Sequence, residues 1–308
     1  MPSGILNVDK PRGQSSHDIV ERIRAMTGVR RVGHAGTLDP LATGVLVVCV
    51  GRLATRVVEY LMDGLKTYRA EARLGVTTDT FDAAGKIVAE APVEVGRDET
   101  ERALDRFRGS IQQIPPMFSA VKHRGRPLYR LARRGVEVER EPRPVEVHRL
   151  ELVDWDPPGC TLEMVCSPGT YVRAVVHDLG QVLGCGASVT GLTRLASGSF
   201  LLENAVRLEA VAQAAREGRW AELLVPVDEA LTNHFPVLRV DAEEAWRLCS
   251  GQAIRGGNVI AQHGELARVY DPEDRFLALA VYDHHDQMWR PRKVFVSPRP
   301  EARAGSSD

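Results

Sequence analysis

The sequence predicts an α+β protein with a large N-terminal domain and a small β-rich C-terminal domain. At 308 residues the chain is longer than a typical single domain. Segments with the two-residue alternation of strands, such as 67–74, are interspersed with segments of helical spacing. Residues 237–297 form a run of short apolar strands and turns, and the proline-flanked segment 226–236 reads as a linker before them.

A strand and a helix open the chain. Residues 5–8 read as a short strand, and Ser15 or Ser16 can cap the helix that follows. Gly28 is the expected end of this helix. Apolar residues at helical spacing give it one face for the core: Ile19, Val20, Ile23 and Met26.

A tightly shaped loop is expected at residues 33–44, which contain three glycines and a proline. It leads into the apolar strand 45–50, and a second helix is expected at 54–62. Residues 98–108 read as helical, and 161–166 as a strand followed by a helix that reaches Leu183. In the strand 67–74 the apolar face is formed by Tyr68, Ala70, Ala72 and Leu74.

Composition excludes several classes of protein. The five cysteines are odd in number and include no C-x-x-C pair, which argues against a disulfide framework and a zinc site. The N-terminus does not resemble a secretion signal, and the longest apolar run, 45–50, is too short to span a bilayer. A cytoplasmic protein without a metal is expected. His284 and His285 are interpreted as a solvated turn, because adjacent side chains in a strand point apart.

Positive charge is concentrated in one block although the net charge is only -1. A nucleic-acid surface would therefore have to be local. Six basic residues follow one another without an intervening acid: Lys122, Arg124, Arg126, Arg130, Arg133 and Arg134. Such a run is often a solvated face, but in this chain it favours contact with phosphates.

Asp39 is the principal candidate for a catalytic group. An aspartate in a glycine-rich loop can simply accept backbone N–H bonds, and taken alone the position favours that role. The chain has no P-loop, no dinucleotide fingerprint and no Ser-His-Asp spacing that would compete with it.

Several motifs in order resemble the bacterial tRNA pseudouridine-55 synthases of the TruB type over nearly the whole chain. They read V-D-K-P-R-G from Val8, G-H-A-G-T-L-D-P-L-A-T-G from Gly33 and K-T-Y-R from Lys66. Further along come P-P-M-F-S-A-V-K from Pro115, G-T-Y-V-R from Gly169 and L-T-R-L from Leu192.

The resemblance implies a catalytic domain at 1–230 with a mixed, mainly antiparallel sheet and flanking helices. It implies an insertion at about 115–150 that clamps RNA, and a PUA-type, β-barrel-like RNA-binding domain at 231–298. The polar residues 299–308 are expected to be a disordered tail.

The same resemblance assigns roles at the site. Asp39 would be the nucleophile, paired with Arg173, and Tyr68 would stack on a flipped uridine. Tyr171 and Leu192 would form pocket walls, and His34 would contact the RNA. Lys10 and Pro11 are treated as structural support. The RNA clamp would use Lys122, Arg124, Arg126, Arg133 and Arg134.

The implied activity is isomerisation of uridine 55 in the T-loop of tRNA, by a monomer without cofactor or obligatory protein partner. Breaking the N1–C1′ bond, rotating the base and rejoining it at C5 needs no redox change and no hydrolysis. Two alternatives stay open. One is the dyskerin type, which shares the catalytic motifs but is targeted by guide RNA. The other is an RNA-binding or RNA-folding protein for which catalysis is dispensable.

Overall fold

The computed structural model describes residues 2–257 and 261–296, which fold as two units. Residues 6–224 form the first, and residues from Val225 onward, together with Ser3–Ile5, form the second. Residues 299–308, the expected disordered tail, lie outside the described part of the chain.

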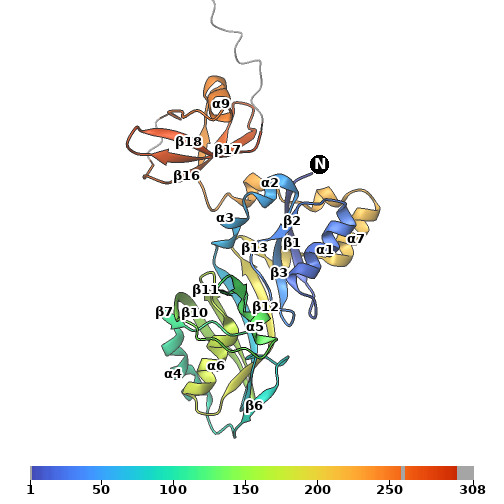
Figure 1. Cartoon of the computed structure of the whole chain (residues 1–308), viewed down its shortest axis with the longest axis vertical. Coiled ribbons are helices and arrows are strands. Elements are labelled where there is room, and N and C mark those ends of the chain that lie inside the picture. Colours follow the sequence, from blue (N-terminus) through green and yellow to red (C-terminus); the bar gives the residue numbers. More distant parts are fainter. Residues whose placement is uncertain (1, 258–260, 297–308) are drawn as a thin grey trace, which may run out of the picture. The chain divides into compact units, whose positions relative to one another are not determined.

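A long mixed sheet forms the centre of the first unit, with helices packed along it (Figure 1). Its main path within the described residues runs β14 (Val206–Arg207), β1 (Gly4–Lys10), β3 (Thr43–Val50), β12 (Ala187–Ser197), β4 (Lys66–Leu74), β11 (Gly159–Cys166), β10 (Arg143–Asp156) and β7 (Gly109–Gln113). The pairs β12–β4, β4–β11, β11–β10 and β10–β7 are antiparallel, whereas β1–β14 and β3–β12 are parallel. The α+β class and the large mixed sheet are thus confirmed.

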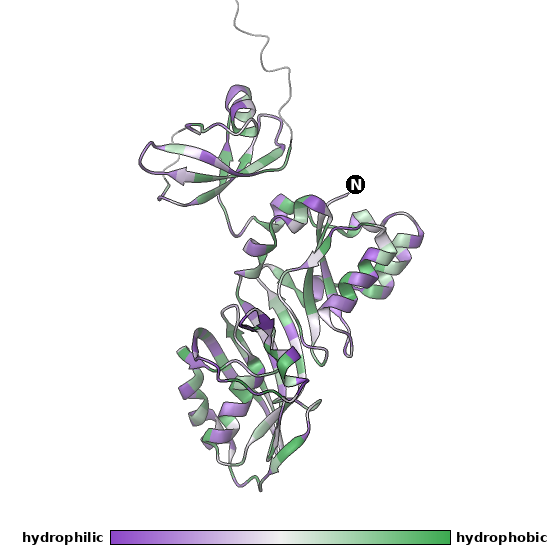
Figure 2. Cartoon of the chain, in the orientation of Figure 1, coloured by the Kyte–Doolittle hydropathy of each residue, from purple (hydrophilic) through white to green (hydrophobic). Residues whose placement is uncertain are grey.

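Strand β4 lies in the middle of this sheet and buries one face, as its alternation predicts. Tyr68, Ala70, Ala72 and Leu74 are buried, whereas Arg69, Glu71 and Arg73 are exposed. Figure 2 shows hydrophilic and hydrophobic residues on both the strands and the helices of the first unit. Because β4 pairs with both β12 and β11, Tyr68 is fixed between two neighbouring strands.

Helix α1 (Ser16–Thr27) begins and ends as its sequence predicts. The Ser15 hydroxyl accepts a hydrogen bond from the Asp18 amide, and the Asp18 carboxylate accepts one from the Ser15 amide. At the other end Gly28 adopts a left-handed conformation, which glycine enters without steric cost. Ile19, Val20 and Ile23 are buried in the core.

Two expected segments differ from their predictions. The helix expected at 54–62 is two short helices, α2 (Gly51–Thr55) and α3 (Val58–Met62). Thr55, Val57 and Val58 are β-branched, which disfavours a continuous helix across the junction. The expected linker 226–236 contains the helix α8 (Val227–Ala230), because Val227 and Ala230 are buried rather than exposed.

The remaining helices and short strands connect these elements. The helical segment expected at 98–108 is α4 (Arg97–Leu104) followed by a 3₁₀ turn (Asp105–Phe107). The other elements of the first unit are β2 (Val32–His34), β5 (Val76–Thr78), β6 (Ile87–Glu90), β8 (Lys122–His123), β9 (Arg126–Pro127), α5 (Leu128–Ala132), α6 (Val172–Val182), β13 (Phe200–Leu201) and α7 (Leu208–Arg216), with 3₁₀ turns at Leu202–Asn204 and Trp220–Leu223.

The second unit has its own sheet and its own core, as expected for a separate β-rich domain. Within the described residues the order is β15 (Val237–Arg239), β16 (Leu266–Tyr270), β17 (Phe276–Asp283) and β18 (Met288–Val294). Helix α9 (Ala242–Cys249) contributes Leu248 to a core that also contains the fully buried Trp289. In the part of the chain that the structure describes, no helix is both long and apolar enough to cross a membrane.

Gly44, at the start of β3, permits a close approach between two parallel strands. Its φ is +92°, and a Cβ at this position would lie 2.3 Å from the carbonyl oxygen of Arg194 on β12. Neither backbone can move easily, because Arg194 is paired with Gly44 across the sheet. A side chain at this position would therefore meet both strain and overlap.

We predict that Gly44→Ala lowers the free energy of unfolding by about 2 to 3 kcal/mol, as backbone strain and overlap act together. Gly13→Ala is the matched control, since Gly13 has a φ of +88° but no atom within 4 Å of the added Cβ. It should lose only the conformational part, about 1 kcal/mol. Equal losses in urea denaturation of the two variants would contradict the close-approach explanation.

Candidate active site

The loop that carries Asp39 joins β2 to β3 and is fixed at several points. The Ser16 hydroxyl of α1 accepts from the Leu38 amide at 2.8 Å and donates to the Leu38 carbonyl at 3.1 Å. The Gly13 amide donates to the Pro40 carbonyl at 2.7 Å. The residues on both sides of Asp39 are therefore held, and the carboxylate is presented from a rigid loop.

Arg194 holds the same loop from β12 and was not assigned a role from the sequence. Its side chain is buried and donates to the carbonyls of Gly36, Thr37 and Val45 at 3.2, 3.4 and 2.7 Å. No acidic side chain pairs with it among the described residues. Its place in the L-T-R-L motif was visible, but its three acceptors are backbone atoms that leave no trace in the sequence.

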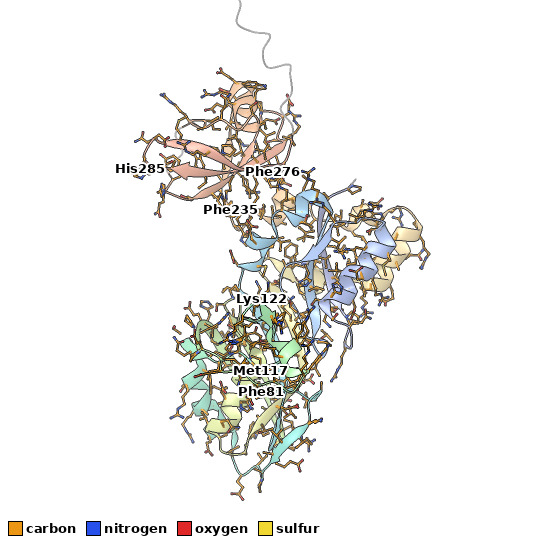
Figure 3. The ribbon with its side chains drawn as sticks, in the orientation of Figure 1. Phe81, Met117, Lys122, Phe235, Phe276 and His285 are labelled. Atoms are coloured by element: carbon orange, nitrogen blue, oxygen red, sulfur yellow. The ribbon has the colours of Figure 1, made fainter. Side chains whose placement is uncertain are left out.

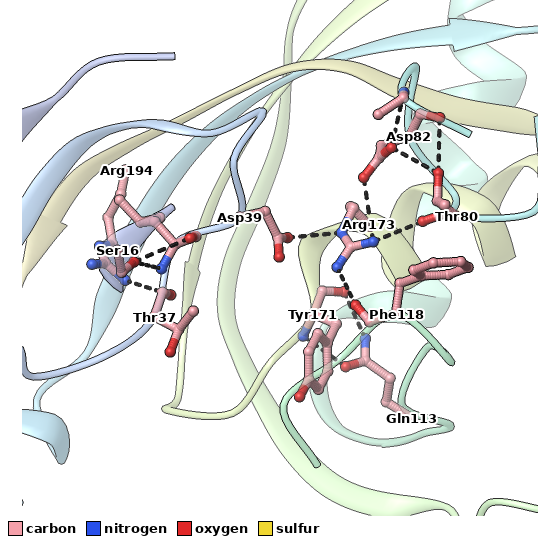
Figure 4. Close-up of polar contacts among 12 residues, drawn as sticks. Ser16, Thr37, Asp39, Thr80, Asp82, Gln113, Phe118, Tyr171, Arg173 and Arg194 are labelled. Atoms are coloured by element: carbon pink, nitrogen blue, oxygen red, sulfur yellow. Dashed lines mark hydrogen bonds and ion pairs between the residues drawn. The ribbon is translucent and has the colours of Figure 1, made fainter. Parts of the chain in front are cut away.

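Arg173, the second residue of α6, is the centre of the site (Figure 4). Its Nε lies 2.9 Å from the Asp39 carboxylate, and its Nη1 lies 3.3 Å from the carboxylate of Asp82. Nη1 also donates to the Thr80 carbonyl at 2.8 Å, and Nη2 to the Phe118 carbonyl at 2.9 Å. Only 4% of the Arg173 side chain is exposed, so these partners replace its hydration.

Asp82 was missed by the sequence analysis. It is buried in the turn after β5, where its Oδ1 accepts from the Thr80 hydroxyl at 2.7 Å and the Ala84 amide at 3.0 Å. Its Oδ2 is left to face Arg173. Nothing in the local sequence around Asp82 indicates a partner on α6.

The carboxylate of Asp39 is poorly solvated although it is open to the pocket. About a third of its side chain (34%) is exposed, at the bottom of a concave site. Burial raises the pKa of Asp39, the Arg173 guanidinium opposes that rise, and the nearby Asp82 adds to it. Arg173 therefore keeps the carboxylate ionised where desolvation would favour the acid.

A pocket of about 270 Å³ opens beside this ion pair. Asp39, Tyr68, Tyr171, Arg173 and Leu192 all line it, although they come from a loop, β4, the turn before α6, α6 itself and β12. Burial raises the pKa of Tyr68, and the positive charge of Arg194 opposes that rise. One flat, apolar wall next to a carboxylate is suited to a planar base.

His34 and Lys10 lie near the loop but not among the residues that line this pocket. His34 is on β2, where burial lowers its pKa and its Nδ1 is buried without a partner. The Lys10 ammonium donates to the carbonyls of Pro11 and Gln14 at 2.9 and 2.7 Å. These contacts agree with the interpretation of Lys10 as structural support.

The basic residues of the candidate clamp lie between β7 and β10, on a segment that runs from 114 to 142. They are exposed, and none forms an ion pair within the described residues: Lys122, Arg124, Arg126, Arg133 and Arg134. The guanidinium of Arg133 lies over the Tyr129 ring at 5.7 Å. Residue Lys122 is labelled in Figure 3.

Comparison with known proteins gives two family matches. Residues 24–172 match the N-terminal domain of the TruB family pseudouridylate synthases, and 173–232 match a tRNA pseudouridylate synthase B C-terminal domain. The chain is 47% identical to "tRNA pseudouridine synthase B" of Pseudomonas aeruginosa (strain UCBPP-PA14), covering 90% of this chain and 91% of that protein. It is 42% identical to the protein of the same name from Dehalococcoides mccartyi (strain CBDB1), covering 97% and 99%.

Among solved structures, the fold is similar to a chain of a Cbf5-Nop10-Gar1 complex. The TM-score is 0.73 at 25% identity, over 96% of this chain and 85% of that one. A chain of an H/ACA RNP bound to a substrate RNA containing 2'-deoxyuridine gives a TM-score of 0.73 at 23% identity. The long sheet and the four-stranded second unit are therefore a known arrangement.

We predict that Arg173→Met lowers the free energy of unfolding at neutral pH by roughly 3 kcal/mol, because two carboxylates lose their counter-charge. The pKa of Asp39, already raised in the folded protein, should rise further. A carboxyl group whose pKa is higher in the folded than in the unfolded state lowers the free energy of unfolding at pH values above its folded pKa. The loss of stability caused by Arg173→Met should therefore shrink as the pH falls through the folded pKa of Asp39. Arg69→Met, which breaks the exposed pair with Glu163, is the control and should cost below about 1 kcal/mol. A penalty that is independent of pH would contradict this role.

Proposed function

Because this chain belongs to the TruB family of pseudouridylate synthases, and is therefore an isomerase, we propose that it converts uridine 55 in the T-loop of tRNA to pseudouridine with Asp39 as nucleophile. The observation that carries this proposal is the Asp39–Arg173 ion pair in the lining of a base-sized pocket. A carboxylate held ionised in a poorly solvated place is the reactive form that nucleophilic assistance requires.

The reaction rearranges one nucleotide without adding or removing atoms. The N1–C1′ glycosidic bond breaks, the base rotates, C5 bonds to C1′, and the proton from C5 is lost as N1 gains one. Asp39 assists bond breaking by attack on the nucleotide and is released when the C-glycoside forms. Arg173 stabilises the carboxylate in its free state and orients it, and Asp82 orients Arg173.

A uridine inside a folded loop must leave its stack to reach Asp39. The rings of Tyr68 and Tyr171 and the side chain of Leu192 provide the walls that would receive it. A T-loop offers bases that can be turned outward, so shape and a few bases are enough for recognition. His34, close to the loop but outside the pocket lining, would contact the RNA beside the extruded base.

The segment 114–142 would bind the phosphates of the T-arm, and the second unit would act as a PUA-type, barrel-like RNA-binding module. We assign the activity to a stand-alone, cytoplasmic monomer without guide RNA. The assignment without guide RNA is supported by sequence identity. It reaches 47% with a protein named tRNA pseudouridine synthase B but 25% with the chain from the Cbf5-Nop10-Gar1 complex.

The direct test is incubation of the purified protein with an unmodified tRNA transcript, followed by nucleotide-resolved mapping of pseudouridine. A single modified position in the T-loop is the expected result. Modification elsewhere, or only after a guide RNA and partner proteins are added, would overturn the assignment of substrate.

We predict that Asp39→Asn abolishes turnover and leaves tRNA affinity within a few-fold, because affinity comes mainly from phosphate contacts. The matched control is Asp156→Asn, which makes the same change at an exposed position and should turn over normally. Single-turnover assays with deamidation excluded check both variants. Measurable isomerisation by Asp39→Asn would rule out its role as nucleophile.

We predict that removing four arginines from the segment 114–142 weakens tRNA binding and flattens its salt dependence. The log–log slope should fall by roughly 0.7 to 0.9 for each phosphate that the variant no longer neutralises. The variant carries alanine at Arg124, Arg126, Arg133 and Arg134. The control removes the same charge from exposed positions elsewhere: Arg97, Arg102, Arg106 and Arg216. Equal slopes for the two quadruple variants would mean that the block acts only through net charge.

A further inference from the structure

The side chain of Gln113 makes a paired contact with the backbone of Tyr171 (Figure 4). Its Nε2 donates to the Tyr171 carbonyl at 3.0 Å, and its Oε1 accepts from the Tyr171 amide at 2.8 Å. Gln113 is the last residue of β7 and only 2% of it is exposed. A primary amide has one donor side and one acceptor side, so it matches a backbone unit as a neighbouring strand would.

The Gln113 contact holds the residue that precedes α6, the helix that carries Arg173. Tyr171 is the N-cap of α6, and its carbonyl also accepts from the amides of Ala174 and Val175. Arg173 lies two residues further on, in the first turn of the helix. The position of the Tyr171 backbone therefore sets the direction from which the Arg173 guanidinium reaches Asp39.

The chain that leaves Gln113 returns to the same turn of α6. Pro115 and Pro116 restrict the conformations of the segment that follows. Five residues after Gln113, the Phe118 carbonyl accepts from Nη2 of Arg173 at 2.9 Å. Phe118 and Met117 also line a hollow with Phe81, which stacks on His177 of α6 with ring centroids 3.8 Å apart (Figure 3). The base of the segment 114–142 is thus attached to α6 at both Tyr171 and Arg173.

We propose that Gln113 is a positioning residue for the reaction, which couples the base of the RNA-binding segment 114–142 to the Arg173–Asp39 pair. This inference rests on the proposed function, because its readout is pseudouridine formation. A shift of the segment on binding RNA is transmitted to α6 at two points. Gln113 transmits it to the backbone of Tyr171, and the Phe118 carbonyl transmits it to Nη2 of Arg173. The coupling acts on the chemical step and leaves the exposed phosphate contacts as they are.

A purely structural role for Gln113 makes a different prediction. Loss of two buried hydrogen bonds would then lower stability and leave both the rate and its pH dependence unchanged in the folded fraction. A positioning role changes the acid limb of the pH–rate profile. If Arg173 loses its alignment, the pKa of Asp39 rises toward the value that burial alone would give, and the limb moves to higher pH.

The first test is Gln113→Leu, measured as single-turnover rate at saturating tRNA beside the wild type. The rate should fall between about tenfold and a hundredfold, as expected for a small misplacement of catalytic groups. The dissociation constant for tRNA should stay within about threefold, since the phosphate contacts remain. Gln112→Leu is the matched control, because Gln112 is the preceding residue of β7 and is exposed. It should retain the wild-type rate and acid limb.

The second variant, Gln113→Glu, keeps the proposal testable if Gln113→Leu does not fold. A neutral glutamic acid donates its O–H to the Tyr171 carbonyl and accepts from the Tyr171 amide, so it reproduces both bonds. An ionised glutamate repels that carbonyl. The ratio of its rate to the wild-type rate should therefore fall as the pH rises. A ratio that does not change with pH, or a Gln113→Leu variant that is impaired only in tRNA affinity, would overturn the proposal. An inactive wild type would instead contradict the proposed function.

Discussion

The site depends on one buried positive charge, the guanidinium of Arg173. Taking such a charge out of water is costly unless its N–H groups are paired, and three segments of the chain supply the partners. They are the loop of Asp39, the turn of Asp82 with Thr80, and the segment that contributes the carbonyl of Phe118. The requirement to satisfy this one side chain brings together elements that are far apart in the sequence, and so builds the pocket.

Buried cations that have no acidic partner at hydrogen-bond distance in the described part of the chain lie around the loop of Asp39 and the strands beside it. Arg194, Lys10 and Lys66 are buried and donate to backbone carbonyls. Burial, together with the positive charge of Arg194, lowers the pKa of Lys10 and of Lys66 to about 8. The charge of Lys10 favours the ionised form of Asp39, and the donors of Arg194 fix the loop that carries it. Electrostatic support and backbone geometry therefore come from two neighbouring buried cations.

The sheet of the first unit and the segment 114–142 differ in burial and in exposed charge. The sheet holds Tyr68 and Leu192 on paired strands, so the walls of the pocket are set before any ligand arrives. The segment 114–142 has short elements, exposed arginines and few buried side chains, of which Leu128 is one. Its charges are available to a polyanion, whereas its base is attached to the first turn of α6. The exposed charges and the pocket therefore lie on different surfaces, and Gln113 joins the base of the segment to the start of α6.

Features that depend on local pattern could be predicted from the amino-acid order alone: the alternation of β4, the caps of α1, the loop around Asp39 and the division into a large unit and a β-rich one. Its ordered motifs also identified the family and the residues Asp39, Tyr68, Tyr171, Arg173 and Leu192, which meet in one pocket. The contacts of Asp82, Arg194 and Gln113, the break between α2 and α3, and the helix α8 became visible only in the folded chain. They rest on burial and on backbone acceptors from distant segments, and a carbonyl oxygen is the same whichever residue carries it.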